Sequence, residues 1–286
     1  MSTQRWNVGE YTITSVVEEQ TDKIPVELFF SGQSGADTLA HPWLIPEFAD
    51  ERGRLRFRVQ AFVVQGRGRC LVIDPCVGNG RRRENPYWNL RNYPFLEQLA
   101  DAGLALNEVD TVVHTHLHAD HVGWGTRLVD GAWTPTFASA RYLYTTRELE
   151  FRRQSKSEAE DVYADAVAPV LAAGLADIVD ENAQLGPGLR LEATPGHSPG
   201  HVSMWIESNG ESALITGDII HHPVQCAEPG WPHAFDDDPD VARATRARML
   251  AHASERGALV LGTHFPNRPA GKIVAEGKAY RFVPLA

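Results

Sequence analysis

Cysteine is scarce in this chain. Only 3 of its 286 residues are cysteine, and Cys70, Cys76 and Cys226 form no Cys-x-x-Cys pair. A disulfide-stabilised domain needs more cysteines and a structural metal clip needs close pairs, so the sequence excludes both classes. We expect the three residues to be free thiols or small core residues.

Long apolar runs and an excess of positive charge are also missing. No segment approaches the roughly 18 to 20 uninterrupted apolar residues of a membrane-spanning helix, and the first residues lack the basic-then-apolar pattern of a secretion signal. The chain has 27 Lys and Arg against 37 Asp and Glu, a formal net charge of −10. Because a phosphate-binding surface needs clustered positive charge, we expect no nucleic-acid partner. We expect a cytoplasmic protein with a small-molecule substrate and no membrane contact, and a solvated loop at Arg81 to Arg83.

The sequence does have enough apolar residues for a large core, at 43% hydrophobic and 22% charged. No Ser-, Gly- or Pro-rich linker divides it, so residues 1–286 are expected to form one domain. Gly, Pro and Asp are frequent at about 31–54, which predicts an irregular loop excursion there. Its apolar residues could form a lid over a pocket or a contact that joins two chains into an expected homodimer. They are Trp43, Leu44, Ile45 and Phe48.

Short β-rich segments alternate with a few helices. Apolar, β-branched runs bounded by turn residues predict strands at 11–17, 59–64, 70–73, 109–113, 189–193, 201–206, 212–216 and 258–261, and a closing hairpin at 271–283. Capping and stop signals predict three helices. The first spans 95–102, the second starts at the capping box 157–160 and ends near 174, and the third runs from 239 to about 255.

The twelve histidines are unevenly distributed, and four potential metal ligands stand within six residues. The strand predicted at 109–113 runs directly into the pattern His-x-His-x-Asp-His. In a loop that leaves a strand, His116 and His118 can converge from one side, and a following turn can direct Asp120 and His121 to a second point. Packed together without a cation, these groups would repel one another or stay unsatisfied, so the pattern indicates a metal site.

Three further candidate ligands each follow a predicted strand. They are His197, Asp218 within Thr-Gly-Asp, and His264 within Gly-Thr-His. Ligands at strand ends are held by rigid elements. The total of five His and two Asp suits Zn²⁺ better than Ca²⁺ or Mg²⁺, which prefer oxygen ligands, while Mn, Co or Fe could also bind.

With these residues the sequence resembles the metallo-β-lactamase superfamily over nearly its whole length. The resemblance implies an α+β fold, the αββα sandwich, in which two mixed β-sheets pack face to face with helices outside. It implies one metal ion on His116, His118 and His197, a second on Asp120, His121 and His264, and a bridge by Asp218. The commonest β-lactamases of this superfamily have Cys near the bridging position, where this chain has Asp, so an antibiotic-degrading role is disfavoured.

The charges of such a site favour hydrolysis. Two divalent ions offset by Asp120, Asp218 and one bridging hydroxide leave about one positive charge, which can hold an oxyanion. We therefore expect a dinuclear-metal hydrolase in which a metal-bridging hydroxide cleaves an ester-type bond in a lactone, aryl ester or phosphotriester. The expected catalytic residues are Asp120, Asp218 and His221.

Two features bear on the substrate. Quorum-quenching lactonases of the superfamily tend to have a tyrosine three residues after the bridging aspartate, where this chain has His221; His221 or His222 could supply a comparable donor to a leaving oxygen. The segments at 235–238 and 275–284 are similar to the methyl-parathion-hydrolase group, which implies an aromatic pocket. The expected pocket residues are Trp124, Phe151 and His222.

Parts of the sequence also match other functions. Gly196-His197-Ser198-Pro199-Gly200 matches the nucleophile elbow of serine hydrolases, but the residue after the serine must donate a backbone N–H, which Pro199 lacks. An acyl-homoserine lactonase and a single-iron persulfide dioxygenase are the two alternatives, and the dioxygenase would leave Asp120 and His121 unliganded. The intact set of seven ligands disfavours a binding module without catalysis.

Overall fold

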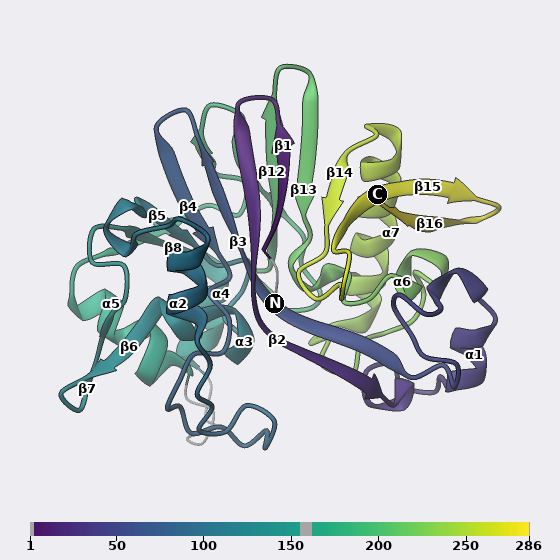
Figure 1. Cartoon of the computed structure of the whole chain (residues 1–286), viewed down its shortest axis with the longest axis horizontal. Coiled ribbons are helices and arrows are strands. Elements are labelled where there is room, and N and C mark those ends of the chain that lie inside the picture. The colour runs from purple at the N-terminus through teal and green to yellow at the C-terminus, as the bar shows by residue number, and fades with distance from the viewer. Residues whose placement is uncertain (1–2, 155–161, 286) are drawn as a thin grey trace. The chain divides into compact units, whose positions relative to one another are not determined.

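The strands of the described residues form two seven-stranded sheets and one two-stranded sheet (Figure 1). The computed structural model describes residues 3–154 and 162–285. The chain divides into two compact units, one from Met1–Glu19 and Val59–Glu181, the other from Gln20–Arg58 and Asn182–Ala286. Both large sheets are mixed, which confirms the predicted α+β class; the single domain stays a prediction.

The first sheet has the strand order β1-β2-β3-β4-β5-β8-β9. β1 is antiparallel to β2 and β3 to β4, whereas β4, β5, β8 and β9 run parallel. The strands are β1 Gln4–Val8, β2 Tyr11–Ile24, β3 Leu55–Gly66, β4 Arg69–Ile73, β5 Thr111–Val113, β8 Arg141–Thr145 and β9 Ala176–Val179. The division between the units falls within β2 and β3. The small sheet pairs β6, Thr126–Val129, with β7, Ala132–Pro135.

Apolar runs form the centre of this sheet. All three residues of β5 are buried, as expected for a parallel strand covered on both faces. Arg67 and Gly68 join β3 to β4 with φ of 51° and 74°, the backbone of a two-residue hairpin loop, so the hairpin predicted here is confirmed.

The helices of the first unit are short. They are α2 Phe95–Asp101, α3 Ala119–Val122, α4 Thr146–Arg153 and α5 Ala168–Ala172, with the turns η3 Leu106–Glu108, η4 Gly123–Gly125 and η5 Tyr163–Val167. α2 confirms the helix predicted before Gly103. The capping box predicted at 157–160 lies outside the described residues, whereas the end predicted near Gly174 agrees with the end of α5.

Arg81 and Arg83 correct one expectation. They are not solvated: they are 0% and 5% exposed, and they ion-pair with Asp165 at 2.5 and 2.7 Å. Arg81 also donates to the Thr126 hydroxyl at 2.7 Å and lies over the Trp133 ring at 4.1 Å from its centroid. Asp165 is 82 residues from Arg83, so the sequence of the basic run alone could not indicate this partner.

The second sheet has the strand order β10-β11-β12-β13-β14-β15-β16, with β13 and β14 parallel and the other neighbours antiparallel. The strands are β10 Gln184–Gly186, β11 Leu189–Ala193, β12 Val202–Ser208, β13 Glu211–Ile215, β14 Leu259–Leu261, β15 Ala270–Glu276 and β16 Ala279–Pro284. The helices of this unit are α1 Gly35–Leu39, α6 Val224–Ala227 and α7 Pro239–Glu255, with the turns η1 Val26–Leu28, η2 Pro42–Leu44 and η6 Gly217–Ile219.

The helix α7 covers part of this sheet and lies beside β15 (Figure 1). Its start follows from local sequence, because Asp238 Oδ1 accepts the backbone N–H of Val241 at 3.1 Å and Pro239 occupies the first helical turn. The predicted helix to Glu255 is confirmed. The β15–β16 hairpin turns at Gly277, with φ 61°, also as predicted.

The excursion at 31–54 contains the helix α1 and the turn η2, so it is less irregular than expected. Leu44 and Phe48 do not form a surface: they are 0% and 1% exposed within the core of the second unit, which includes Trp205 and Phe265. Trp43 and Ile45 pack against the same core. The expectation of an apolar surface is therefore wrong for Leu44 and Phe48, and the homodimer stays a prediction.

All three cysteines lie in the interior of the protein. Cys70, Cys76 and Cys226 are all buried and free. Among the described helices, none is both long and apolar enough to cross a lipid bilayer.

Candidate metal centre

The His-x-His-x-Asp-His segment of the first unit leaves β5 and turns into α3. The ring centroid of His116 lies 4.5 Å from that of His118 and 4.1 Å from that of His121. Asp120 Oδ2 lies 3.7 Å from His121 Nε2. The first unit therefore brings together the four ligands predicted from this segment, three of them buried and His118 half-buried.

Asp74 supports this group from the end of β4, although sequence analysis did not single it out. Its carboxylate accepts the Thr115 backbone N–H at 2.8 Å and the Thr115 hydroxyl at 2.7 Å, and Oδ2 lies 3.0 Å from His121 Nδ1. Nδ1 of His121 thus lies against Asp74, and Nε2 lies on the side of Asp120. Asp74 directly follows the buried strand β4, as the predicted ligands follow theirs. Its position after a strand is therefore the signal that could have identified it.

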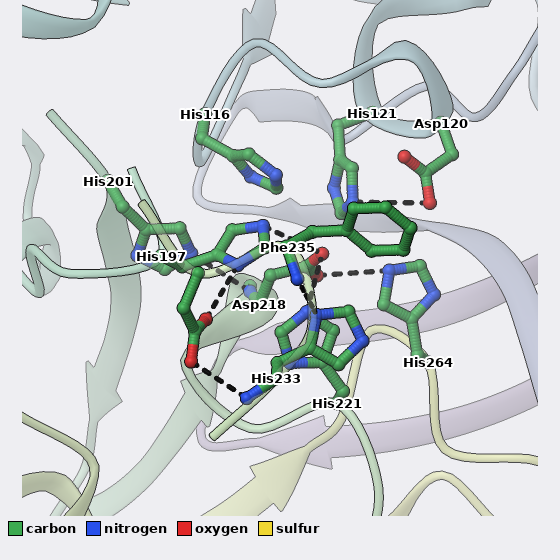
Figure 2. A network of polar contacts seen from close by, with 12 residues as sticks. His116, Asp120, His121, His197, His201, Asp218, His221, His233, Phe235 and His264 are labelled. Carbon is green, nitrogen blue, oxygen red and sulfur yellow. Dashed lines mark hydrogen bonds and ion pairs between the residues drawn. The ribbon is translucent and has the colours of Figure 1, made fainter. Parts of the chain in front are cut away.

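In the second unit, imidazole rings surround the carboxylate of Asp218 (Figure 2). His197 Nε2 and His221 Nε2 lie 3.5 and 3.3 Å from Oδ2, and His264 Nε2 lies 3.0 Å from Oδ1. All four residues are buried. Asp218 stands in η6 directly after β13, and its backbone N–H donates to His201 Nε2 at 2.9 Å, which fixes this turn.

In His197 and His264 the other ring nitrogen, Nδ1, points away from Asp218 and contacts a hydrogen-bond acceptor. His264 Nδ1 lies 2.7 Å from the Arg58 carbonyl oxygen, and His197 Nδ1 lies 3.0 Å from Asp236 Oδ1. In each ring the Nδ1 contact is shorter than the contact of Nε2 with Asp218, so the ring proton is assigned to Nδ1 and the Nε2 lone pair faces Asp218. Lone pairs that face a carboxylate repel it unless a cation is shared, so this donor set fits a divalent metal ion.

His233 joins this group, and sequence analysis missed it. Its ring stacks on His221 with centroids 3.4 Å apart and an interplanar angle of 10°, and ligand atoms of His197, His221 and His233 lie within 4.8 Å of one another. Burial lowers the pKa of His221 to about 4 and that of His233 well below 6.5, so both rings are neutral at pH 7. His233 stands in a loop without repeated spacing, so only its residue type could have indicated it.

The predicted pocket residues take different places. His222 Nε2 donates to the Phe48 carbonyl oxygen at 2.9 Å, and its Nδ1 accepts a backbone N–H at 3.1 Å. Trp124 is buried in the first unit and donates to the Glu18 carboxylate at 2.6 Å. Phe151 is 37% exposed on α4. The roles of all three at a substrate stay predictions.

Aromatic rings that the sequence analysis did not select lie against the histidines of the second unit. Phe57 stacks on His264 with centroids 4.3 Å apart, and Phe29 contacts Phe57 at 4.9 Å and His233 at 5.3 Å. Phe235 lies 5.5 Å from His233 and is 62% exposed (Figure 2). An apolar aromatic surface therefore adjoins the candidate ligands in this unit.

Comparison with known sequences identifies the family. A family model described as the metallo-beta-lactamase superfamily matches residues 54–264. The probable metallo-hydrolase YybB of Bacillus subtilis (strain 168) is 29% identical over 142 residues, which cover 46% of this chain and 59% of YybB. An N-acyl homoserine lactonase of Bacillus thuringiensis is 32% identical over 138 residues, which cover 48% of each chain. The chain thus spans about half to three-fifths of the length of these curated relatives.

Solved structures agree over nearly the whole chain. Hydrolase AbOPH of the β-lactamase superfamily has a TM-score of 0.81 at 25% identity, covering 99% of this chain and 97% of AbOPH. AidC, a dizinc quorum-quenching lactonase, has a TM-score of 0.80 at 18% identity with the same coverage. The predicted fold is therefore confirmed. With this fold and a family match across 54–264, the chain belongs to the metallo-β-lactamase superfamily.

Proposed function

We propose that this chain is a metal-dependent hydrolase that opens lactones and cleaves related ester-type bonds. The observation that carries the proposal is the convergence of His197 Nε2 and His264 Nε2 on the buried carboxylate of Asp218, at 3.5 and 3.0 Å. Relatives named as a metallo-hydrolase and as lactonases support this class of reaction.

We propose that the chain binds two divalent metal ions. Zn²⁺ is our first choice and Mn, Co or Fe are the alternatives, because imidazole and carboxylate ligands suit all of them. The seven predicted residues would hold them: His116, His118 and His197 one ion, Asp120, His121 and His264 the other, and Asp218 both. When bound, the ions supply Lewis-acid polarisation of the substrate and a water of lowered pKa.

The protein's own residues would orient the ligands and donate a hydrogen bond to the substrate. The Arg58 carbonyl oxygen would hold His264 through a hydrogen bond at Nδ1, and the Asp74 carboxylate, 3.0 Å from His121 Nδ1, would orient His121. We propose His221 as the hydrogen-bond donor to the leaving oxygen, because the neutral ring keeps one N–H and its Nε2 lies 3.3 Å from Asp218. His222 is less suited, since both of its nitrogens are hydrogen-bonded to the backbone.

The aromatic rings of the second unit support a substrate with an apolar acyl or aryl group. Phe29 and Phe57 pack beside His233 and His264, and Phe235, which is 62% exposed, presents its ring to a ligand beside His233. An acyl-homoserine lactone has such an acyl chain. An aryl phosphotriester, which the resemblance to the methyl-parathion-hydrolase group suggests, has such a leaving group.

The test is an initial-rate assay of the metal-loaded protein on an acyl-homoserine lactone and an aryl phosphotriester, with bound metal counted. We expect two metal equivalents and faster opening of the lactone. Asp218→Asn should keep the circular-dichroism spectrum of the wild type, lose at least one metal equivalent and lower turnover by about 100-fold or more. Asp240→Asn is the matched control, because Asp240 lies on the surface with its side chain 88% exposed.

The outcomes separate the alternatives. Faster phosphotriester cleavage would replace the lactone by the phosphotriester as substrate class. One bound iron with blank-level rates on both substrates would refute the hydrolase and favour the persulfide dioxygenase. Full activity with two metals in Asp218→Asn would refute the bridging role of Asp218.

A further inference from the structure

Asp236 is a buried carboxylate on the loop before α7, and its side chain is 0% exposed. Its Oδ1 lies 3.0 Å from His197 Nδ1, while its Oδ2 accepts the His233 backbone N–H at 3.0 Å. The backbone N–H groups of the two following residues donate to the carbonyl oxygens of His197 and Gly196 at 3.1 and 2.9 Å. The loop that carries Asp236 is therefore bonded to the loop that carries His197 through both side chain and backbone.

Arg246 holds Asp236 from α7. Its guanidinium is 0% exposed and lies 3.4 Å from Asp236 Oδ2. The Nε group donates to the Ile219 carbonyl oxygen at 2.7 Å, and Nη1 donates to the carbonyl oxygens of Pro229 and Trp231 at 2.9 Å each. Ile219 directly follows Asp218, so one buried cation ties together Asp236 and the turn that carries Asp218.

We propose that Asp236 and Arg246 are positioning residues that fix the orientation and the tautomer of His197. Two acceptor-only carboxylates face this ring, and Asp236 is the nearer: Nδ1 lies 3.0 Å from Asp236 Oδ1, whereas Nε2 lies 3.5 Å from Asp218 Oδ2. The shorter contact places the ring proton on Nδ1 and leaves the lone pair on Nε2. Arg246 neutralises the carboxylate, which would otherwise be costly to bury. The inference rests on the proposed function, in which His197 is a metal ligand.

The two carboxylate oxygens of Asp236 have different partners, so Asp236→Asn should change the protonated nitrogen of His197. On one side, the His233 N–H and the Arg246 guanidinium both donate, so they require the amide oxygen of the asparagine. The amide NH₂ must then face His197, whose Nδ1 becomes an acceptor and whose proton moves to Nε2. A protonated Nε2 cannot bind a metal ion, so the variant should lose this ligand while keeping its volume.

The first measurement is the tautomer of His197 in the metal-free protein, by long-range ¹H–¹⁵N correlation of the imidazole rings. We expect Nδ1–H in the wild type and Nε2–H in Asp236→Asn. The matched control, Asp240→Asn, changes the same group at a solvent-exposed position of α7 and should leave the tautomer unchanged. Nε2–H in the wild type would overturn the proposal even if the variant failed to fold, and so would an unchanged tautomer in Asp236→Asn.

The second measurement is Zn²⁺ affinity by competition with a chelator. In Asp236→Asn we expect one zinc equivalent to bind about 10- to 100-fold more weakly, with the other unchanged. A switched tautomer with unchanged affinity for both ions would overturn the positioning of a metal ligand. If the wild type binds no zinc or other divalent metal, the proposed function fails, and the tautomer experiment still decides whether Asp236 controls His197.

Discussion

Glu18 should make the first unit less stable as the pH rises. Its carboxyl group is 4% exposed and accepts hydrogen bonds from Trp124 Nε1 at 2.6 Å and from the backbone N–H groups of Val77 and Gly78 at 2.9 and 3.1 Å. Burial raises the pKa of Glu18 from 4.5 to about 7, more than these hydrogen bonds lower it.

The sign of the effect follows from proton binding. Between pH 4.5 and about 7 the unfolded chain releases the Glu18 proton while the folded chain keeps it. The folded state then binds more protons, so the free energy of unfolding falls as the pH rises. The stabilisation is fully present below pH 4.5 and is lost as the pH passes about 7; the two pKa values differ by an amount equivalent to about 3 kcal/mol.

The assay is urea unfolding of the wild type and Glu18→Gln from about pH 4 to about pH 8.5, at one fixed metal concentration, followed by tryptophan fluorescence. Glutamine does not titrate, so the free energy of unfolding of Glu18→Gln minus that of the wild type should rise by about 3 kcal/mol across this range. Glu10→Gln is the matched control, because Glu10 is 53% exposed in its side chain, and its difference should stay flat. A flat difference for Glu18→Gln, or one that falls with pH, would refute the reasoning.

Two substitutions test packing and buried charge. Gly196→Ala should lower the thermal unfolding temperature, because φ is +129° and an added Cβ would lie 2.2 Å from the Ala242 backbone nitrogen. The control is Gly210→Ala, which has open space at φ +80° and should lower the free energy of unfolding by only about 1 to 2 kcal/mol. Asp165→Asn should lower the free energy of urea unfolding by about 3 to 5 kcal/mol, because Arg81 and Arg83 stay buried without their partner. The exposed Asp177→Asn should cost less than about 1 kcal/mol, and an equally small loss for Asp165→Asn would show that the buried pair is not needed.

The ligands of the candidate centre that were predicted from the sequence are those whose positions follow from neighbouring residues in the chain. His116, His118, Asp120 and His121 lie within one loop, so their spacing alone indicates that they meet. Asp218 and the other distant ligands follow buried strands, whose ends are positioned by the sheet. The strand and helix predictions succeeded for the same reason, since β-branched runs and capping residues act over a few positions.

The contacts that were missed arise from tertiary packing. Asp236 and His233 stand in a loop, and Phe29 lies more than 200 residues from the His233 ring that it contacts, so no periodicity connects them. Leu44 and Phe48 stand among turn-forming residues that resemble a surface loop, yet the core of the second unit covers them. Their burial is decided by distant partners, which a single sequence does not reveal.

The parallel pairing of β4 with β5 has a consequence for how the chain tolerates insertions. Ile73 pairs with Val113, and the Asp74 N–H donates to the Val113 carbonyl oxygen at 3.0 Å, so Asp74 and the histidine loop leave the same edge of the sheet. One residue inserted within either strand would shift everything after it by about 3.3 Å and turn each side chain to the opposite face. Residues added at the exposed turn between β6 and β7, around Gly131, would leave this register intact. Strand register, rather than the length of the connecting chain, is therefore what any redesign of the histidine loop must preserve.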